Sequence, residues 1–343
     1  MIQGQKEKEI AKEVLNLAEA LGEKSRERRR DFHRFPETAW YEMRTSAVIA
    51  KTLTELGYEV LTGRQVCLDT ARIGLPSKEE LQKHAEEVLN QNVPTEYLTE
   101  EMKQGFTGVI GILRCGEGPV VGLRFDIDAL GLIEEASEAH RPFREGFSSQ
   151  NPGVMHACGH DAHAAIGLGT AEVLWQMRKQ LHGTIKLIFQ PGEEGVKGAR
   201  AIVEHGHLDD VDYFVGTHVA PTKGPDDGDV TPGTWGSLAT SKYDAFFYGQ
   251  AAHAGGFPEK GASAIVAAAN AVLNLTAIPR HSEGITRVNV GKIQGGTGRN
   301  VVPDYAMIQF EVRGHTTKIN RYMDEQARQI CEGAAKMAGC RCE

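Results

Sequence analysis

The sequence predicts an α/β protein made of a larger domain with a buried sheet and a smaller ferredoxin-like module. Two observations indicate the larger domain and its end: apolar strand-like runs alternate with helical segments up to residue 219, and a turn-rich segment follows at 220–236. A third is the order β-α-β-β-α beyond that segment, which is the order of a ferredoxin-like module. A chain of 343 residues is long enough to bury both cores.

In the first part, apolar residues recur at helical spacing over roughly 9–21 and 43–56, and a short strand is expected at 57–62. The polar segment 67–105 has helical tendency and is interpreted as an insertion beside the sheet. The expected strands that follow are continuously apolar, which is typical of a sheet buried on both faces. Strands and helices are expected, in chain order, over 108–115, 119–128, 161–181, 183–190, about 196–205, and 212–219.

In the second part we expect a strand, a helix, two strands, a helix and the start of a last strand. Their residues are 241–250, 261–277, 286–296, 305–314, 318–338 and 340 onward. We place the domain boundary between residues 233 and 234, which gives a first domain of residues 1–233 and a second of 234–343. On this division the second domain ends before its last strand is complete.

Composition excludes several classes of function. A net charge of −8 argues against a nucleic-acid partner, and the basic run RERRR at 26–30 is interpreted as a solvated helix face. No apolar stretch approaches about 20 residues, so no membrane span is expected. The N-terminus has no apolar signal-peptide core, and the six cysteines form no disulfide framework. These features favour a cytoplasmic protein.

Metal-binding residue types follow three of the predicted strands and precede one predicted helix. Two aspartates end the strand 119–128, two glutamates follow the strand 183–190, a histidine ends the strand 212–219, and MHACGHDAH at 155–163 precedes a helix. In open α/β sheets, ligands bind beyond the carboxyl ends of the strands, so we expect these side chains to meet at one rim. They are Asp126, Asp128, Cys158, His160, Glu193, Glu194 and His218.

Taken singly, each of these features also has a structural explanation. A glutamate pair is compatible with a solvated loop, a strand-end histidine with a structural role, and HACGHDAH with a helix N-terminus beside a buried thiol. Their occurrence together at strand ends favours a shared site. Paired C-x-x-C spacing for structural zinc and C-x-x-C-H for haem are absent. Thiolate, imidazole and carboxylate together suit a hydrolytic centre of the Zn or Mn type, with a free carboxylate as general base.

Seven motifs together resemble the dinuclear-metal amidohydrolases of the aminoacylase and carboxypeptidase type. The resemblance runs from about residue 25 to the end, on HRFPET, RFDIDAL, MHACGHDAH, QPGEEG, GTHV, AAHAGGFPEKGASA and GGTGRNVVP. It implies a zinc-peptidase-like α/β/α catalytic domain with an inserted ferredoxin-like lid and dimerisation domain. It also implies two divalent metal ions, Mn or Zn.

The resemblance assigns roles to residues of the first domain. Cys158, His160, Glu194 and His218 would be metal ligands, with the Cys158 thiolate shared between the two ions. Glu193 would be the general base that activates water. Asp128 would orient the site, although a strand-end turn carboxylate is the alternative for it.

The same resemblance assigns roles to the lid. His253 would reach the active site of the other protomer and stabilise the oxyanion, while Asn300 and Arg313 would hold the substrate's carboxylates. For Arg313 the alternative is an ordinary charge at the end of a strand. A homodimer formed through the lid is expected, and a second homologous subunit is a further expected partner.

The activity that the resemblance implies is hydrolysis of p-aminobenzoyl-glutamate, a folate breakdown product, to p-aminobenzoate and glutamate. A broader N-acyl-amino-acid or dipeptide amidohydrolase is the alternative. Family members return from the lid to the first domain through a C-terminal segment with a further metal-binding histidine, whereas this sequence ends at Glu343 within the lid. A shortened chain of doubtful activity, or a non-catalytic dimerising partner, is therefore also an expectation.

Overall fold

The computed structural model describes residues 2–219, 230, 233 and 236–343, and the chain divides into two compact units, Met1–Lys223 and Gly224–Glu343. Each unit has its own sheet and its own hydrophobic core. We predicted the boundary between residues 233 and 234, and residue 234 lies outside the described residues. The limits of the two domains therefore stay a prediction.

The first unit contains a five-stranded sheet in the order β1-β2-β4-β3-β5. Strand β2 is antiparallel to β1 and β4, whereas β3, β4 and β5 run parallel. Side chains alternate along β2, with Val109 in one core, and Ile110 and Ile112 in the core on the opposite face. The strands are β1 (Glu59–Thr62), β2 (Val109–Arg114), β3 (Val120–Asp126), β4 (Thr184–Gln190) and β5 (Tyr213–Gly216).

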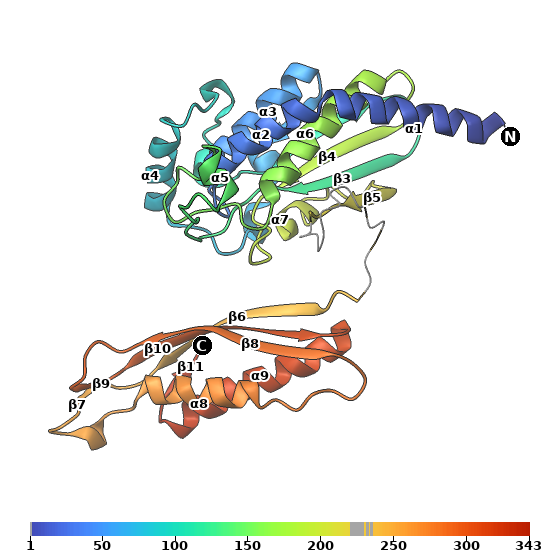
Figure 1. Ribbon diagram of the computed structural model, residues 1–343. Coiled ribbons are helices and arrows are strands. Elements are labelled where there is room, and N and C mark those ends of the chain that lie inside the picture. The colour runs from blue at the N-terminus through green and yellow to red at the C-terminus, as the bar shows by residue number, and fades with distance from the viewer. Residues whose placement is uncertain (1, 220–229, 231–232, 234–235) are drawn as a thin grey trace. The chain divides into compact units, whose positions relative to one another are not determined.

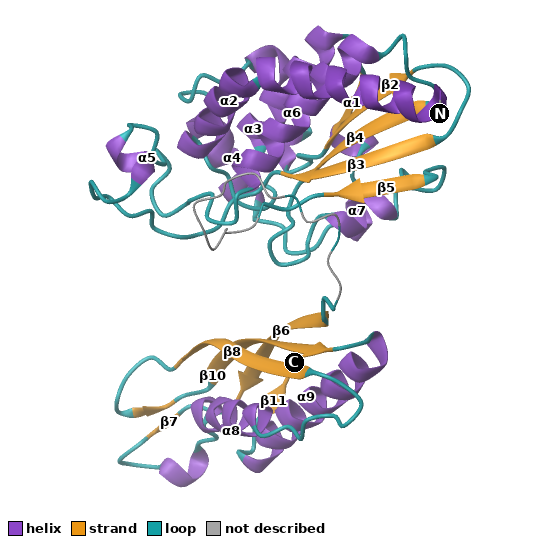
Figure 2. Cartoon of the chain, turned by 45° about the vertical axis from the view of Figure 1, so that its right-hand side comes forward, coloured by secondary structure: helices purple, strands orange, loops and turns teal. Residues whose placement is uncertain are grey.

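Helices cover both faces of this sheet. Figures 1 and 2 show α3 and α6 on one face and α7 on the other. The predicted helix 43–56 has these bounds in the structure because Gly57, at φ +96°, ends it in the left-handed conformation. The helices are α1 (Ile2–Ala20), α2 (Gly22–Arg34), α3 (Met43–Leu56), α4 (Lys78–Val88), α5 (Arg141–Arg144), α6 (His160–Met177) and α7 (Ala199–Val203). Among the helices of the described residues, none is long and apolar enough to cross a membrane.

The basic run on α2 was interpreted as a solvated helix face, and this interpretation is wrong for Arg28, Arg29 and Arg30. Arg28 pairs with Glu172 at 2.5 Å, Arg29 pairs with Asp161 at 2.8 Å, and Arg30 pairs with a glutamate beyond α5. The physical reason is the packing of α2 along α6, which brings carboxylates within reach of these side chains. The run therefore stabilises a helix pair, and its charge is balanced within the unit.

Strand β5 also differs from the prediction of a fully buried strand. All four of its residues are exposed, including Tyr213, Phe214 and Val215. Among the described strands it lies at the edge of the sheet and pairs with β3. An apolar run identifies a strand, but it does not tell whether neighbouring elements cover that strand.

The second unit has the predicted ferredoxin-like topology. Its four-stranded antiparallel sheet has the order β11-β6-β10-β8, and α8 and α9 pack on one face (Figures 1 and 2). A separate two-stranded ribbon joins β7 to β9. The elements are β6 (Ala239–Tyr248), β7 (Ala252–His253), α8 (Ala264–Thr276), β8 (Thr286–Gly295), β9 (Val301–Val302), β10 (Tyr305–Gly314), α9 (Thr317–Met337) and β11 (Arg341–Cys342).

Candidate metal centre

The predicted metal ligands gather around His160, the first residue of α6. Ligand atoms of Cys158, His160 and His218 lie within 4.8 Å of one another, and so do those of His160, Glu193 and Glu194. The Cys158 Sγ lies 3.5 Å from His218 Nε2. The glutamates follow β4 and His218 follows β5, so the side chains meet at the strand ends as predicted.

His160 presents one ring nitrogen to this cluster. Its Nδ1–H donates to the backbone oxygen of Asp128 at 2.8 Å, and its Nε2 is buried without a hydrogen-bond partner among the described residues. Burial lowers the pKa of His160, but the carboxylates of Asp128 and Asp126 outweigh it and raise the pKa to about 9. The raised pKa means that Nε2 also tends to hold a proton, which a metal ion at Nε2 would displace. Because Nδ1 is fixed by its hydrogen bond, the ring is oriented to present Nε2 to a metal.

The Cys158 thiol lies in strongly negative surroundings. Burial and the charges of Glu194 and Glu193 raise its pKa to about 12. A divalent cation reverses this effect, because a coordinating thiol loses its proton. A thiolate, two imidazoles and a carboxylate are a donor set that fits Zn or Mn ions. The residues present therefore fit a divalent metal centre.

Gly159 allows the two halves of the cluster to approach each other. It has φ +89° and precedes the first turn of α6. A Cβ at this position would lie 2.4 Å from Cγ2 of Val219, the residue after His218. Only glycine fits here, because both the conformation and the contact exclude a side chain.

Two buried carboxylates hold the turn that carries the glutamate pair. Glu42 Oε1 accepts the N–H of Gly192 at 2.8 Å, while Asp128 accepts the N–H groups of Glu193 and Glu194 at 3.0 and 2.9 Å. Three successive backbone N–H groups are thus held by buried side chains. Asp128 has the contacts expected of a residue that orients the site, and Glu42 is a further such residue that sequence reasoning missed.

His163 fixes the loop that carries His218. Its Nε2 accepts the N–H of Val219 at 2.8 Å, so its Nδ1 carries the proton and donates to Asp126. Burial raises the pKa of Asp126, but the hydrogen bond from His163 and the charge of Arg124 lower it by more. The net shift of the pKa is therefore downward and favours the ionised carboxylate. His163 thus supports the His218 loop from within the MHACGHDAH segment.

His156 of the same segment is buried beside the cluster. Neither of its ring nitrogens has a hydrogen-bond partner in the described part of the chain. Burial lowers its pKa to about 4, so the ring is neutral near pH 7. It fills space behind the cluster and adds no charge.

His33, from HRFPET, secures the start of α6. Its Nδ1 lies 2.8 Å from Asp161 Oδ2 and its Nε2 lies 2.9 Å from Glu134 Oε1. Burial lowers the pKa of His33, but the two carboxylates outweigh this and raise it. Burial also opposes ionisation of Asp161, yet His33 and Arg29 hold its pKa at about 2. Each member of the buried pair therefore favours the charged form of the other, next to the candidate ligand His160.

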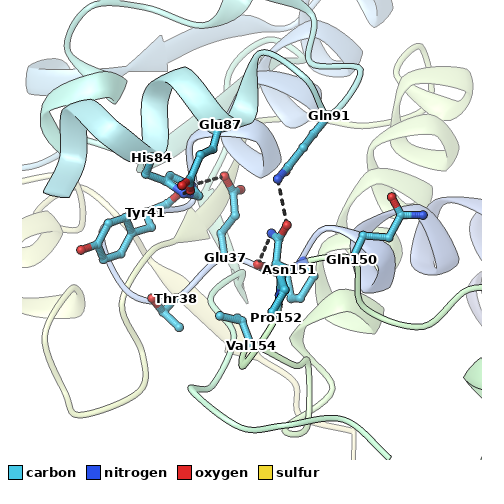
Figure 3. Close-up of a pocket in the computed structure, with 11 residues that line it drawn as sticks. Glu37, Thr38, Tyr41, His84, Glu87, Gln91, Gln150, Asn151, Pro152 and Val154 are labelled. Carbon is cyan, nitrogen blue, oxygen red and sulfur yellow. Dashed lines mark hydrogen bonds and ion pairs between the residues drawn. The ribbon is translucent and has the colours of Figure 1, made fainter. Parts of the chain in front are cut away.

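Two pockets lie near this part of the first unit. Figure 3 shows the first, the His84 pocket of about 470 Å³, where Glu37 pairs with His84 and Gln91 donates to Asn151. Its polar groups bind one another, and none of its lining residues belongs to the metal-ligand cluster. The second, of about 480 Å³, is lined by Glu194 and therefore adjoins the cluster.

In the second unit, the β7–β9 ribbon brings His253 and Asn300 together. His253 pairs with Val301, and the backbone N–H of Ala254 donates to the backbone oxygen of Asn300 at 3.0 Å. The His253 Nδ1 accepts N–H groups from Gly255 at 3.2 Å and Gly256 at 2.9 Å. Its Nε2 therefore carries the proton, and the exposed ring offers a hydrogen-bond donor.

Arg313 is not brought to this ribbon. It lies near the far end of β10, whose ends are roughly 30 Å apart at the usual rise of a strand. Its guanidinium pairs with both carboxylate oxygens of Glu311 at 2.8 and 3.0 Å. The unit therefore places Asn300 beside His253 and holds Arg313 apart from both.

A cluster of thiol, imidazole and carboxylate at the strand ends of an α/β sheet, with a ferredoxin-like unit in the same chain, defines a metal-dependent hydrolase. The model of peptidase family M20/M25/M40 matches residues 122–341, and the chain belongs to this family. The predicted family, its fold class and the predicted class of amide-bond hydrolase are thereby confirmed.

Three similar proteins extend this assignment. The chain is 49% identical over 312 residues to one of the subunits of p-aminobenzoyl-glutamate hydrolase of Escherichia coli (strain K12), covering 91% of the chain and 71% of that protein. It is 49% identical over 316 residues to indole-3-acetyl-aspartic acid hydrolase of Enterobacter agglomerans, covering 92% and 72%. The crystal structure of aminobenzoyl-glutamate utilization protein from Klebsiella pneumoniae superposes with a TM-score of 0.80 at 42% identity, covering 96% and 76%.

The ion pair of His33 with Asp161 predicts a pH-dependent stability. Because the folded-state pKa of His33 lies above its ordinary value of 6.5, its contribution is complete below pH 6.5 and is lost as pH rises through the raised pKa. His33→Gln should lower the free energy of unfolding by about 3 kcal/mol at pH 6 and by clearly less at pH 9. Urea unfolding followed by tryptophan fluorescence measures both values.

His182→Gln is the matched control, since His182 is exposed ahead of β4. It should change stability by less than about 0.5 kcal/mol at either pH. An equal loss for His33→Gln at pH 6 and pH 9 would show that the charge of His33 contributes nothing.

Proposed function

We propose that the protein hydrolyses the amide bond of p-aminobenzoyl-glutamate and releases p-aminobenzoate and glutamate. The observation that carries the reaction is the position of the Glu193 carboxylate, which lies within 4.8 Å of ligand atoms of His160 and Glu194. The substrate is supported by the 49% identity to the Escherichia coli p-aminobenzoyl-glutamate hydrolase chain. The cytoplasm is the proposed location, in keeping with six cysteines that are all free.

Cys158, His160, Glu194 and His218 would hold two divalent ions, Mn or Zn. When bound, such ions lower the pKa of water and polarise the amide carbonyl. Glu193 accepts the proton of the attacking water and returns it to the leaving nitrogen. Burial and the neighbouring charge of Glu194 raise the pKa of Glu193 above its ordinary value, which makes the carboxylate a better proton acceptor.

A homodimer formed through the second unit would complete the site. The partner subunit's His253 would donate its Nε2–H to the oxyanion that forms from the carbonyl, a role supported by the tautomer that Gly255 and Gly256 impose. Asn300, beside it on the ribbon, and Arg313, after exchanging its Glu311 partner, would help to hold the substrate's carboxylates. One relative is named as a single subunit of its hydrolase, which favours a second, homologous subunit for this chain too.

A second candidate substrate is indole-3-acetyl-aspartate, since the hydrolase that is named for this compound is also 49% identical to the chain. Both compounds join an aromatic acyl group to an acidic amino acid. They differ in the acyl group and in the length of the amino-acid side chain. The ratio of kcat/KM for the two conjugates decides which is the better substrate, and a higher value for hippurate than for either would favour a broader amidohydrolase.

Glu193→Gln should lower kcat on p-aminobenzoyl-glutamate by about 10³-fold or more, because the variant cannot accept the water's proton. The bound metal should remain, since the four ligands are unchanged. Release of p-aminobenzoate measures turnover, and mass spectrometry of the metal measures occupancy. Wild-type turnover by Glu193→Gln would refute the proposed mechanism.

Mixing two inactive variants tests the role of the dimer. In a hybrid of Glu193→Gln with His253→Ala, one of the two sites contains both an intact Glu193 and an intact partner His253. An equimolar mixture that exchanges subunits should regain about a quarter of wild-type activity. Activity no higher than the sum of the separate variants would show that each protomer uses its own His253.

A further inference from the structure

The pocket beside the metal-ligand cluster has mostly apolar walls and one cation. Leu75, Pro76 and Leu130 line it together with the ring of Tyr41, and Glu194 forms part of its wall. Lys197 also lines this space, which we call the Lys197 pocket. A pocket with apolar walls and few polar groups is typical of a site for a small organic molecule.

The Lys197 side chain is held between two glycines. A Cβ on Gly74 would lie 3.1 Å from Lys197 Cε and 3.6 Å from its Nζ, and a Cβ on Gly195 would also lie 3.1 Å from Cε. Both glycines have positive φ, at +65° and +85°, so each position favours glycine for its backbone as well. The aliphatic stem thus follows a channel without side chains, which fixes where the ammonium group can lie.

The turn that carries Lys197 also carries the glutamate pair. The N–H groups of Lys197 and Gly198 both donate to the Gly192 oxygen, at 3.0 and 2.8 Å, and close the turn on itself. Val196, next to Lys197, has φ +59°, which is a strained conformation for a β-branched residue. Backbone strain of this kind is retained where the surrounding structure fixes a side chain for function. Glu194 and Lys197 therefore occupy fixed places on one closed turn.

The charge of Lys197 is available to a ligand. Within the described part of the chain it forms no ion pair, whereas Arg124 pairs with Asp126 at 2.6 Å. Glu80, the other acidic residue of the pocket besides Glu194, caps α4 by accepting the N–H of Ser77 at 2.8 Å. Lys197 is thus the pocket's cation, next to a metal ligand and without a carboxylate partner.

We propose that Lys197 binds the side-chain carboxylate of the substrate's acidic amino acid and sets the preference for acyl-glutamate over acyl-glutamine. The inference rests on the proposed function, which places the scissile amide at the cluster that includes Glu194. A substrate with two carboxylates needs cations besides the metal centre, and an ammonium in a pocket with apolar walls binds a carboxylate more strongly than one in open water.

The test compares three substrates on the metal-loaded chain: p-aminobenzoyl-glutamate, the corresponding glutamine compound without the side-chain charge, and the isoglutamine compound without the α-carboxylate. Lys197→Met should raise KM for the glutamate compound about tenfold or more and leave kcat/KM for the glutamine compound within about twofold. Lys197→Arg, which keeps the charge, should preserve most of the preference. Lys179→Met, at an exposed position just after α6 in the first unit, controls for the change in net charge.

An equal loss on the glutamate and glutamine compounds, or no change in KM, would overturn the proposal. A loss on the glutamate and glutamine compounds with none on the isoglutamine compound would assign Lys197 to the α-carboxylate and would also overturn it. If the wild-type chain hydrolyses none of the three, the proposed function fails instead. Calorimetric binding of p-aminobenzoyl-glutamate then decides the role of Lys197, since an unchanged Kd in Lys197→Met refutes it.

Discussion

The candidate site depends on how two buried carboxylates bind one turn of backbone. Glu42 and Asp128 accept three successive N–H groups from Gly192, Glu193 and Glu194. Because these bonds form away from water, they hold the turn far more firmly than solvent-exposed contacts would. The proposed general base Glu193, the proposed metal ligand Glu194 and, through the closure of the turn, Lys197 all take their positions from this arrangement.

The same arrangement concentrates negative charge. Glu42 and Asp128 lie next to each other, and burial together with the charge of Asp128 raises the pKa of Glu42. The pKa shifts of Cys158 and His160 have the same origin. Burial and nearby carboxylates disfavour the ionised Cys158 thiolate, and nearby carboxylates favour the protonated His160 imidazole. A divalent cation relieves this repulsion and converts the ligands to their binding forms. The candidate centre therefore carries negative charge that divalent cations would offset, whereas His33 and Asp161 next to it form a balanced pair.

Local sequence patterns predicted several of the helices and strands, because each of these patterns depends on residues close together in the sequence. The helix predicted at roughly 43–56 was confirmed, since Gly57 ends it, and the ferredoxin-like order followed from the succession of apolar runs. Residues that act across the chain were missed. Glu42 lies 150 residues from Gly192, and His33 lies 128 residues from Asp161, so no spacing relates the partners. The exposure of β5 and the ion pairs of RERRR were mispredicted for the same reason: they depend on what the fold places beside them. The meeting of His253 with Asn300 likewise requires the short β7–β9 ribbon, which no sequence pattern predicted.

The central claim is that Cys158, His160, Glu194 and His218 form a centre for two divalent ions. Metal stoichiometry of the purified 343-residue chain, after dialysis against Mn or Zn and removal of free metal, tests it most directly. The account predicts about two ions per chain, as expected for a two-metal hydrolytic site, and a loss of both affinity and stoichiometry in Cys158→Ala. Fewer than about one ion per chain, or occupancy that does not change in Cys158→Ala, would contradict it.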